Sequence, residues 1–409
     1  MTTSTRTRMK QTGTLIGSGL MVMALALSAC GTDPSAGAVP GAPTATAEAV
    51  VATPESSAPT PDPTATATPT LEPNPTVAPT PEPTATAEPS ATPTPTPEPL
   101  PQSAYLEPMT HAYQTWNNCA AVSTSMVLSY YGITMTQQQL QPIFRPNPGD
   151  KHVEPPQLVA FFPQYGLRTR IVEGGSIEVV KRLVAAGFPV ITPQWLDHKP
   201  DAIGHYRVVR GYDDNRGGFI VNDSMLGPDV LLPYGEFEEL WRAFNYRYLP
   251  VYRPEDEPRV LAILGEDADP QRNYQRALAL FQRLAEERPD DAYVWFSIGT
   301  SYFLLGDYQA AVQAYERAEV IGLPPKMLWY QFWPVAAYNN IGNHQRALEL
   351  ATAQIATAGT FGEMRYERGR AFEAMGNIDA AIAEYRRALL DDVNLTVARE
   401  ALARLGAAL

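Results

Sequence analysis

Residues 118–132 read NCAAVSTSMVLSYYG, and this stretch decides the fold of the region around it. Its apolar residues recur at helical spacing, and Gly132 is a typical residue at which a helix stops. Asn118 is a favourable N-cap, so we predict that the helix begins at Cys119. The only cysteine of the central part of the chain then occupies a first helical turn.

That position favours ionisation of the Cys119 thiol. Unpaired backbone N–H groups and the positive end of the helix dipole stabilise a thiolate relative to a thiol. The alternative for a cysteine at this position is a buried structural residue. The chain has two cysteines, Cys30 and Cys119. A disulfide between them is conceivable, but if Cys30 has another role, Cys119 is a lone and reactive thiol.

The sequence predicts helices at 155–166 and 177–186, and strands follow them. Residues 204–223 read GHYRVVRGYDDNRGGFIVND, in which two β-prone runs flank a turn rich in Asp, Asn and Gly. This pattern predicts an antiparallel hairpin. With its tip near Asp214, His205 lies opposite Asp223, and another strand is expected at 189–194.

A helix with a cysteine at its start, followed by antiparallel strands with a histidine and then an aspartate, resembles a known family. The stretches 114–132, 204–213 and 221–224 are similar to the papain-like family of bacteriocin-processing (double-glycine leader) cysteine peptidases. The resemblance covers about 140 residues. It implies an α+β papain-like domain, in which the N-terminal helix carries the cysteine and the antiparallel sheet carries the histidine and aspartate.

The resemblance also implies a role for each site residue. Cys119 attacks a peptide carbonyl, His205 accepts and returns the proton, and Asp223 orients the imidazole. Gln114 and the backbone N–H of Cys119 stabilise the oxyanion. The substrate is a peptide or protein, and this chemistry needs no cofactor and no metal.

Other residues and other functions compete with this interpretation. Asn222 is an alternative orienter, since neighbouring strand residues point to opposite faces and only one of them can face His205. The remaining histidines lack paired spacing for zinc, which favours surface or packing roles: His111, His152, His198 and His344. The domain is alternatively a non-catalytic binding scaffold, which Ala120 in place of the family's usual glycine favours, or a cell-wall peptide endopeptidase.

After Pro254 the sequence becomes rich in Ala, Leu and Arg, with helical periodicity. Related segments recur around Gly306, Gly342 and Gly376, which are 36 and 34 residues apart. The spacing and the Trp295–Tyr302 segment resemble the tetratricopeptide repeat. We therefore expect an all-α solenoid that binds a protein partner, or that only covers the peptidase domain. The copy containing Pro334 departs most from the pattern, so its helices are expected to be kinked or irregular.

The N-terminus resembles a bacterial lipoprotein signal peptide. Three basic residues precede an apolar run at 15–27, which is too short to span a membrane comfortably, and small residues lead to Cys30. The resemblance implies cleavage before Cys30 and its lipidation. The expected location is the extracytoplasmic face of the cell membrane, with a lipid anchor.

Residues 31–102 repeat Pro, Thr, Ala and Glu and contain eight acids but no Lys or Arg. So few large apolar side chains cannot offset the entropy of ordering, and we expect a disordered stalk. The formal net charge of the chain is −13, and no basic stripe is present, which argues against nucleic acid as a partner.

The predicted organisation is a signal peptide (1–29), a Pro/Thr-rich stalk (30–102), a papain-like peptidase domain (103–254) and a tetratricopeptide-repeat domain (255–409). The predicted function is that of a surface-anchored cysteine peptidase whose helical repeats recruit a peptide or protein.

Overall fold

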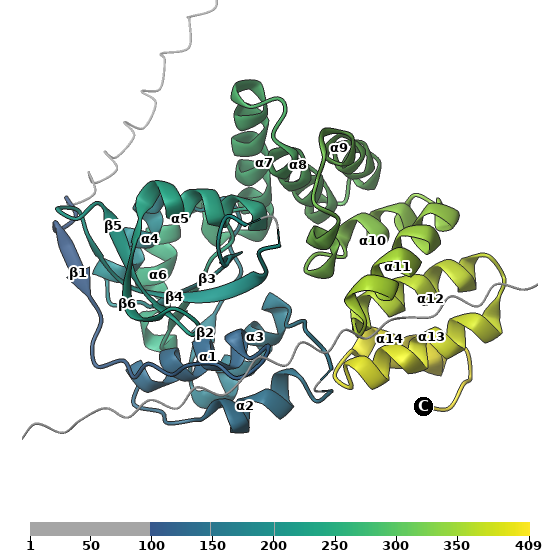
Figure 1. Cartoon of the computed structure of the whole chain (residues 1–409), viewed down its shortest axis with the longest axis horizontal. Helices are drawn as coiled ribbons and strands as arrows, with labels where there is room; N and C mark the ends of the chain where they lie inside the picture. The colour runs from purple at the N-terminus through teal and green to yellow at the C-terminus, as the bar shows by residue number, and fades with distance from the viewer. Residues whose placement is uncertain (1–98, 148, 200) are drawn as a thin grey trace, which may run out of the picture. The chain divides into compact units, whose positions relative to one another are not determined.

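The computed structural model describes residues 99–147, 149–199 and 201–409, which belong to one compact unit (Figure 1). The predicted signal peptide, Cys30 and nearly all of the stalk lie outside the described residues. The predictions of lipidation, disorder and membrane anchoring therefore remain predictions.

The first part of the unit is built on an antiparallel sheet. Its strand order is β2-β7-β3-β4-β5-β6, and β1 pairs with β4 beside this path. The strands are β1 (Ser103–Tyr105), β2 (Arg168–Thr169), β3 (Val190–Trp195), β4 (Gly204–Asp213), β5 (Gly218–Asp223), β6 (Gly227–Pro233) and β7 (Leu249–Tyr252). The predicted hairpin is formed by β4 and β5.

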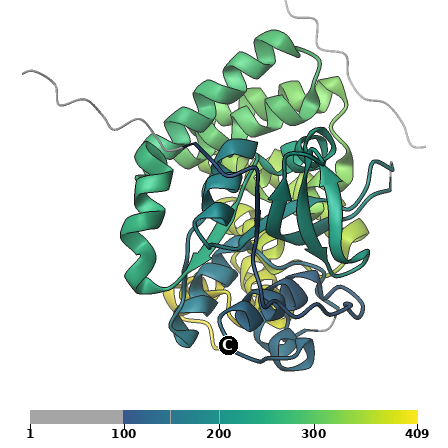
Figure 2. The ribbon, with the colours of Figure 1, turned by 90° about the vertical axis from the view of Figure 1, so that its left-hand side faces the viewer.

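Helices pack on this sheet. They are α1 (Cys119–Tyr130), α2 (Gln137–Phe144), α3 (Pro155–Phe161), η1 (Phe162–Tyr165), α4 (Ile177–Ala185), α5 (Tyr234–Trp241) and η2 (Arg242–Phe244). Of these, α1 and α4 contact β4, and α5 contacts β3 and β5. Figure 2 shows the sheet and its helices from a second direction.

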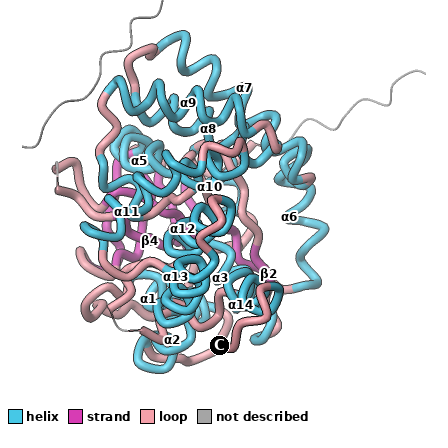
Figure 3. The backbone as a smooth tube through the Cα atoms, turned by 90° about the vertical axis from the view of Figure 1, so that its right-hand side faces the viewer, coloured by secondary structure: helices cyan, strands magenta, loops and turns pink. Residues whose placement is uncertain are grey.

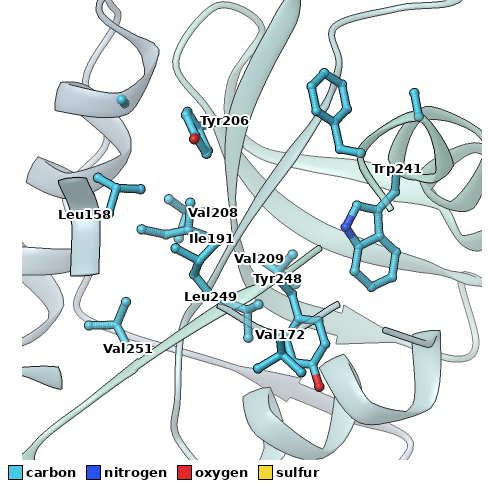
Figure 4. Packing of buried hydrophobic residues seen from close by; sticks show 14 of the residues in the cluster. Leu158, Val172, Ile191, Tyr206, Val208, Val209, Trp241, Tyr248, Leu249 and Val251 are labelled. Carbon is cyan, nitrogen blue, oxygen red and sulfur yellow. The ribbon is translucent and has the colours of Figure 1, made fainter. Parts of the chain in front are cut away.

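The core fills both faces of the sheet. Val208 and Ile191 lie toward Leu158 of α3, whereas Val209 and the Tyr248 ring lie on the side of Trp241 of α5 (Figure 4). All of these side chains are buried, so both faces of β4 are removed from water. Continuous burial on both faces fixes the register of β4, since a slip by one residue would exchange the two faces.

The predicted ends of α1 agree with the structure. Asn118 precedes the helix, and Tyr131 caps it before Gly132, whose φ of 78° is unfavourable for residues with a side chain. Met126, Val127 and Leu128 are completely buried in the core. The start of α1 is thereby fixed in space by its own apolar face.

Helices make up the rest of the chain (Figure 3). They are η3 (Pro254–Asp256), α6 (Glu257–Leu264), η4 (Gly265–Ala268), α7 (Pro270–Glu287), α8 (Ala292–Leu305), α9 (Tyr308–Ile321), η5 (Pro325–Trp329), α10 (Trp333–Asn340), α11 (His344–Ala358), α12 (Gly362–Ala374), α13 (Ile378–Asp391) and α14 (Thr396–Arg404). Successive helices from α7 onward pack against each other, and most are joined by short turns, whereas residues 322–332 with η5 connect α9 to α10.

Small residues and aromatic rings hold the repeat pairs together. A Cβ atom at Gly299 of α8 would lie 2.6 Å from the ring of Tyr315 of α9. A Cβ atom at Gly369 of α12 would lie 2.5 Å from the ring of Tyr385 of α13. The same small-to-aromatic contact thus recurs in two copies, as expected for a repeat array.

The copy that contains Pro334 is irregular. Its first helix, α10, has only 8 residues, whereas α8 has 14, and the 3₁₀ turn η5 precedes it. The peptidase-like α+β domain followed by an all-α repeat solenoid is confirmed as the fold class. Among the described residues, no helix combines the length and apolar character that crossing a membrane requires.

Candidate active site

Cys119 is the first residue of α1 and lies at the edge of the core, where it is partly exposed. Burial alone raises the pKa of its thiol. The neighbouring His205 side chain and its charge lower this pKa, and backbone N–H groups lower it further. The lowering effects prevail, so the Cys119 pKa lies below its ordinary value.

The loop before Cys119 is held by the side chain of Asn118. This side chain does not cap α1. Its amide instead donates to Thr115 Oγ1 at 2.7 Å, to Gln141 Oε1 at 3.1 Å and to Gln137 Oε1 at 3.2 Å. Arg145 donates to Asn118 Oδ1 at 3.2 Å and also contacts the loop backbone. Helix α2 therefore fixes the conformation of the loop before Cys119.

His205 is the second residue of β4 and is buried. Ser123 of α1 donates to the carbonyl oxygen of Tyr206 at 3.1 Å, which joins the helix of the thiol to the strand of the imidazole. Burial lowers the pKa of His205, but its hydrogen bond with Asp223 and the neighbouring Cys119 thiol raise the pKa above the ordinary histidine value. The thiol and the imidazole therefore favour their charged forms together.

Asp223 ends β5 and is completely buried. Its Oδ1 lies 3.0 Å from His205 Nε2 and accepts the backbone N–H groups of Met225 and Leu226 at 2.7 and 2.9 Å. Burial raises the pKa of Asp223, but His205, Arg207 and the backbone donor of Leu226 hold it far below its usual range. Asp223 is therefore a carboxylate whenever the protein is folded near neutral pH.

The hairpin register differs from the one expected. Val208 pairs with Asn222, and a bulge between Val209 and Gly211 shifts the pairing. Asp223 thus lies beside Arg207 in the ladder and reaches His205 diagonally, rather than lying directly opposite it. The turn at the tip is therefore slightly later in the sequence than we predicted.

Sequence reasoning missed Arg207. Its Nε donates to Asp223 Oδ2 at 2.8 Å, and its Nη atoms donate to Gln194 Oε1 and to two backbone carbonyls at 2.6–2.9 Å. Arg207 is fully buried, and its Nε and Nη atoms are all hydrogen-bonded. It therefore places a fixed positive charge next to the Asp223 carboxylate. The available signal was its place two residues after His205, which puts both side chains on one face of the strand.

Gln114 lies next to the end of β5. Its backbone N–H donates to the carbonyl oxygen of Ser224 at 2.9 Å, and Ser224 Oγ donates to its Oε1 at 2.7 Å. These bonds orient the amide and leave its Nε2 end as the hydrogen-bond donor. His111 Nε2 lies 2.9 Å from the carbonyl oxygen of Asp223, which adds a second link between the two segments.

A groove of about 530 Å³ brings these residues together. Gln114, Cys119 and His205 all line it, as do Trp116 and residues of the helical repeats. Trp116 is 66% exposed, so it is a groove residue rather than a core aromatic. The groove is large enough for an extended peptide segment.

The alternative candidates have other hydrogen-bond or ion-pair partners, although His152 also lines a pocket of about 50 Å³ with Cys119 and His205. Asn222 is buried, and its Oδ1 accepts the N–H of Asp229 at 3.2 Å, so Asp223 alone of this pair contacts His205. His152 is buried against Glu154 rather than on the surface, and His198 and His344 make contacts away from the groove. Within residues 99–147, 149–199 and 201–409, no cluster of His, Cys, Asp and Glu could hold a metal ion.

Family models match both halves of the described chain. Residues 101–249 match the Peptidase_C39 like family, and residues 264–325 and 362–390 match the tetratricopeptide repeat. A comparison with curated protein sequences gave no match.

Solved structures are similar to one part of the chain or the other. A C39-like peptidase from Bacillus anthracis is 19% identical over 37% of this chain and 98% of its own, with a TM-score of 0.31. A double glycine motif protease of an AMS/PCAT transporter, solved with its leader peptide, is 21% identical over 37% and 94%, with a TM-score of 0.30. MamA from Desulfovibrio magneticus RS-1 is 18% identical over 40% and 86%, with a TM-score of 0.30.

Proposed function

We propose that this chain, which carries a Peptidase_C39-like domain followed by tetratricopeptide repeats, is a cysteine peptidase that uses Cys119, His205 and Asp223. The observation that carries the proposal is the 3.0 Å contact between His205 Nε2 and a buried Asp223 carboxylate, together with the lowered pKa of Cys119. A nucleophile, a base and an orienting group are the three parts that acyl transfer by a thiol needs.

The proposed reaction proceeds through an acyl-enzyme. The Cys119 thiolate attacks the peptide carbonyl, and the oxyanion is stabilised by the Cys119 N–H and the Gln114 amide. The protonated imidazole of His205 gives its proton to the leaving amine as the C–N bond breaks. His205 then takes a proton from water as the water oxygen attacks the thioester. The carboxylic acid is released as the C–S bond breaks, and this restores the Cys119 thiolate and the protonated imidazole.

Asn222, the alternative residue for orienting His205, has less support than Asp223. Asp223 is charged, buried and bonded to both His205 and Arg207, so it can stabilise the imidazolium throughout the cycle. Ala120 is buried within α1, where helical geometry accommodates alanine without a need for glycine. Its presence therefore does not favour an inactive scaffold.

We also propose that the protein is anchored at the extracytoplasmic membrane face through a lipid on Cys30, with the stalk as a spacer of up to roughly 200 Å. The support is the sequence of the signal region and the Pro/Thr-rich composition that follows it. In a bacterial host, Cys30→Ser should move the protein from the membrane fraction to the soluble fraction. An unchanged distribution would exclude the lipid anchor.

A peptide library tests the proposed activity. The full chain should cleave a subset of peptides, and Cys119→Ala should cleave none, because the nucleophile is absent. His344→Gln, which changes a histidine of the helical repeats, should cleave the same subset as the wild type. A wild-type protein that binds peptides without cutting them would support the scaffold alternative, and cleavage by Cys119→Ala would exclude this mechanism.

A further inference from the structure

The irregular repeat copy turns toward the peptidase domain. Gln331, which is buried, donates to the carbonyl oxygen of Ala243 at 3.2 Å. Two residues earlier, the Trp329 ring lies 5.9 Å from the ammonium group of Lys151. The departure of this copy from the repeat pattern therefore coincides with its contact with residues of the peptidase domain.

Tyr330 lies against the residue that precedes the proposed base. A Cβ atom at Gly204 would be 2.8 Å from two ring carbons of Tyr330, so the ring occupies the space that a side chain there would need. The Tyr330 ring also packs edge-on against Trp195 at 5.6 Å and Phe244 at 6.2 Å. These contacts fix the position of the ring beside His205.

Trp329 and Tyr330 line the groove that holds Cys119. Tyr330 also lines a second, smaller pocket of about 50 Å³ that includes Cys119 and His205. The peptidase domain alone thus does not form the whole wall of the groove. Two aromatic residues of the repeats complete it.

The exposed area of the whole groove lining is mainly apolar. Large side chains that reach solvent there are Tyr113, Trp116, Ile203 and Met225, which are 61%, 66%, 38% and 43% exposed. Besides the Cys119 and His205 pair, Lys151 is the only charged side chain among the described residues that line the groove. An exposed apolar patch of this kind marks a binding surface, and aromatic faces supply large contact areas at low entropic cost.

We infer that Trp329 and Tyr330 are specificity-determining residues of the groove. They select an extended peptide segment with uncharged, apolar side chains next to the bond that Cys119 attacks. Trp329 contacts the side chains of this segment, and Tyr330 limits their size beside Gly204. The inference about selection at the cleaved bond rests on the proposed function. The inference that Trp329 and Tyr330 form part of the groove wall does not.

Thiol reagents of two sizes test the wall without any need for peptidase activity. Cys119 in the full chain is alkylated by iodoacetamide and, separately, by the bulkier neutral reagent N-phenylmaleimide. In Trp329→Ala and Tyr330→Ala, the rate with the bulky reagent should rise several-fold relative to the rate with iodoacetamide, because part of the wall is removed.

Trp295→Ala is the matched control, since Trp295 is a partly buried tryptophan of α8 that lies outside the groove lining. Its ratio of rates should equal that of the wild type. An unchanged ratio in a folded Trp329→Ala protein would overturn the inference, even if Tyr330→Ala fails to fold. Thermal unfolding of each variant establishes which of them are folded.

Cleavage profiles then test the selectivity. The preference of the wild type for apolar over charged side chains should fall by about tenfold or more in Trp329→Ala, the size expected for a lost apolar contact in an enzyme pocket. The change should be in KM more than in kcat, because binding is lost and the reacting groups are untouched. An active Trp329→Ala protein with the wild-type preference contradicts the inference. A wild type that cleaves nothing contradicts the proposed function, and the alkylation rates then decide whether these residues form the groove wall.

Discussion

Replacing His205 by glutamine should raise the pKa at which Cys119 becomes reactive. In the wild type, burial raises the thiol pKa, and the neighbouring His205 together with backbone N–H groups lowers it by more. Glutamine keeps a polar side chain of similar length but has no positive charge. Burial then still raises the pKa, but the His205 side chain no longer lowers it. The Cys119 pKa should therefore rise to its ordinary value or above it.

The size of the effect follows from the fraction of thiolate. With an ordinary cysteine pKa of about 8.5, roughly one thiol in a hundred is ionised at pH 6.5. If the wild-type thiol is mostly ionised at that pH, His205→Gln should slow alkylation by up to about 100-fold. At pH values above the raised pKa of the variant thiol, the two proteins should react at similar rates, because both thiols are then largely ionised.

The assay is the rate of iodoacetamide alkylation of the full chain between pH 5 and pH 10. His344→Gln serves as the control, because this histidine lies at the start of α11 in the repeats and its profile should match the wild type. The reasoning is refuted if wild-type Cys119 reacts no faster than a free cysteine at pH 6.5. It is refuted equally if His205→Gln reproduces the wild-type profile.

Three further predictions concern stability. Asp223→Ala should lower the free energy of unfolding in urea by about 3–5 kcal/mol, because it leaves the buried Arg207 without its charged partner, and a loss below 1 kcal/mol would contradict this. Gly369→Ala should destabilise the repeats by about 1–3 kcal/mol, since its Cβ would lie 2.5 Å from a tyrosine ring, whereas Gly235→Ala, whose Cβ meets nothing within 4 Å, is the neutral control in thermal unfolding. Burial lowers the pKa of His152, but a neighbouring glutamate raises it to about 9, so the stability that this pair contributes is present below about pH 6.5 and is lost as the pH rises through about 9. The unfolding temperature should therefore fall over this range, and it should fall less in His152→Gln; equal slopes would exclude His152 as the cause.

The elements that carry the candidate site were predictable because their signals are local. A helix that starts at Cys119 and stops before Gly132 follows from apolar spacing and from the residues at its two ends. The β4–β5 hairpin follows from two β-prone runs around a polar turn. The repeats follow from spacings of 36 and 34 residues between equivalent glycines. Each of these patterns lies within a few dozen residues of sequence.

The register of the hairpin was harder to predict from the sequence. A bulge between Val209 and Gly211 moved Asp223 beside Arg207, and Gly211 inside the predicted strand was its one available sequence signal. The diagonal contact of Asp223 with His205 depends on this shift, and so does the ion pair between Arg207 and Asp223. Neither could be derived from the strands taken singly.

The sequence by itself determined the order of the elements, the lone thiol at the head of a helix and the repeat period, because propensity, capping and periodicity act between near neighbours in the chain. Only the tertiary structure decided that Arg207 lies under Asp223 and that Trp329 and Tyr330 face the Cys119 groove. Those contacts join segments up to about two hundred residues apart, and they form only when buried surfaces of the sheet and the repeats are packed together.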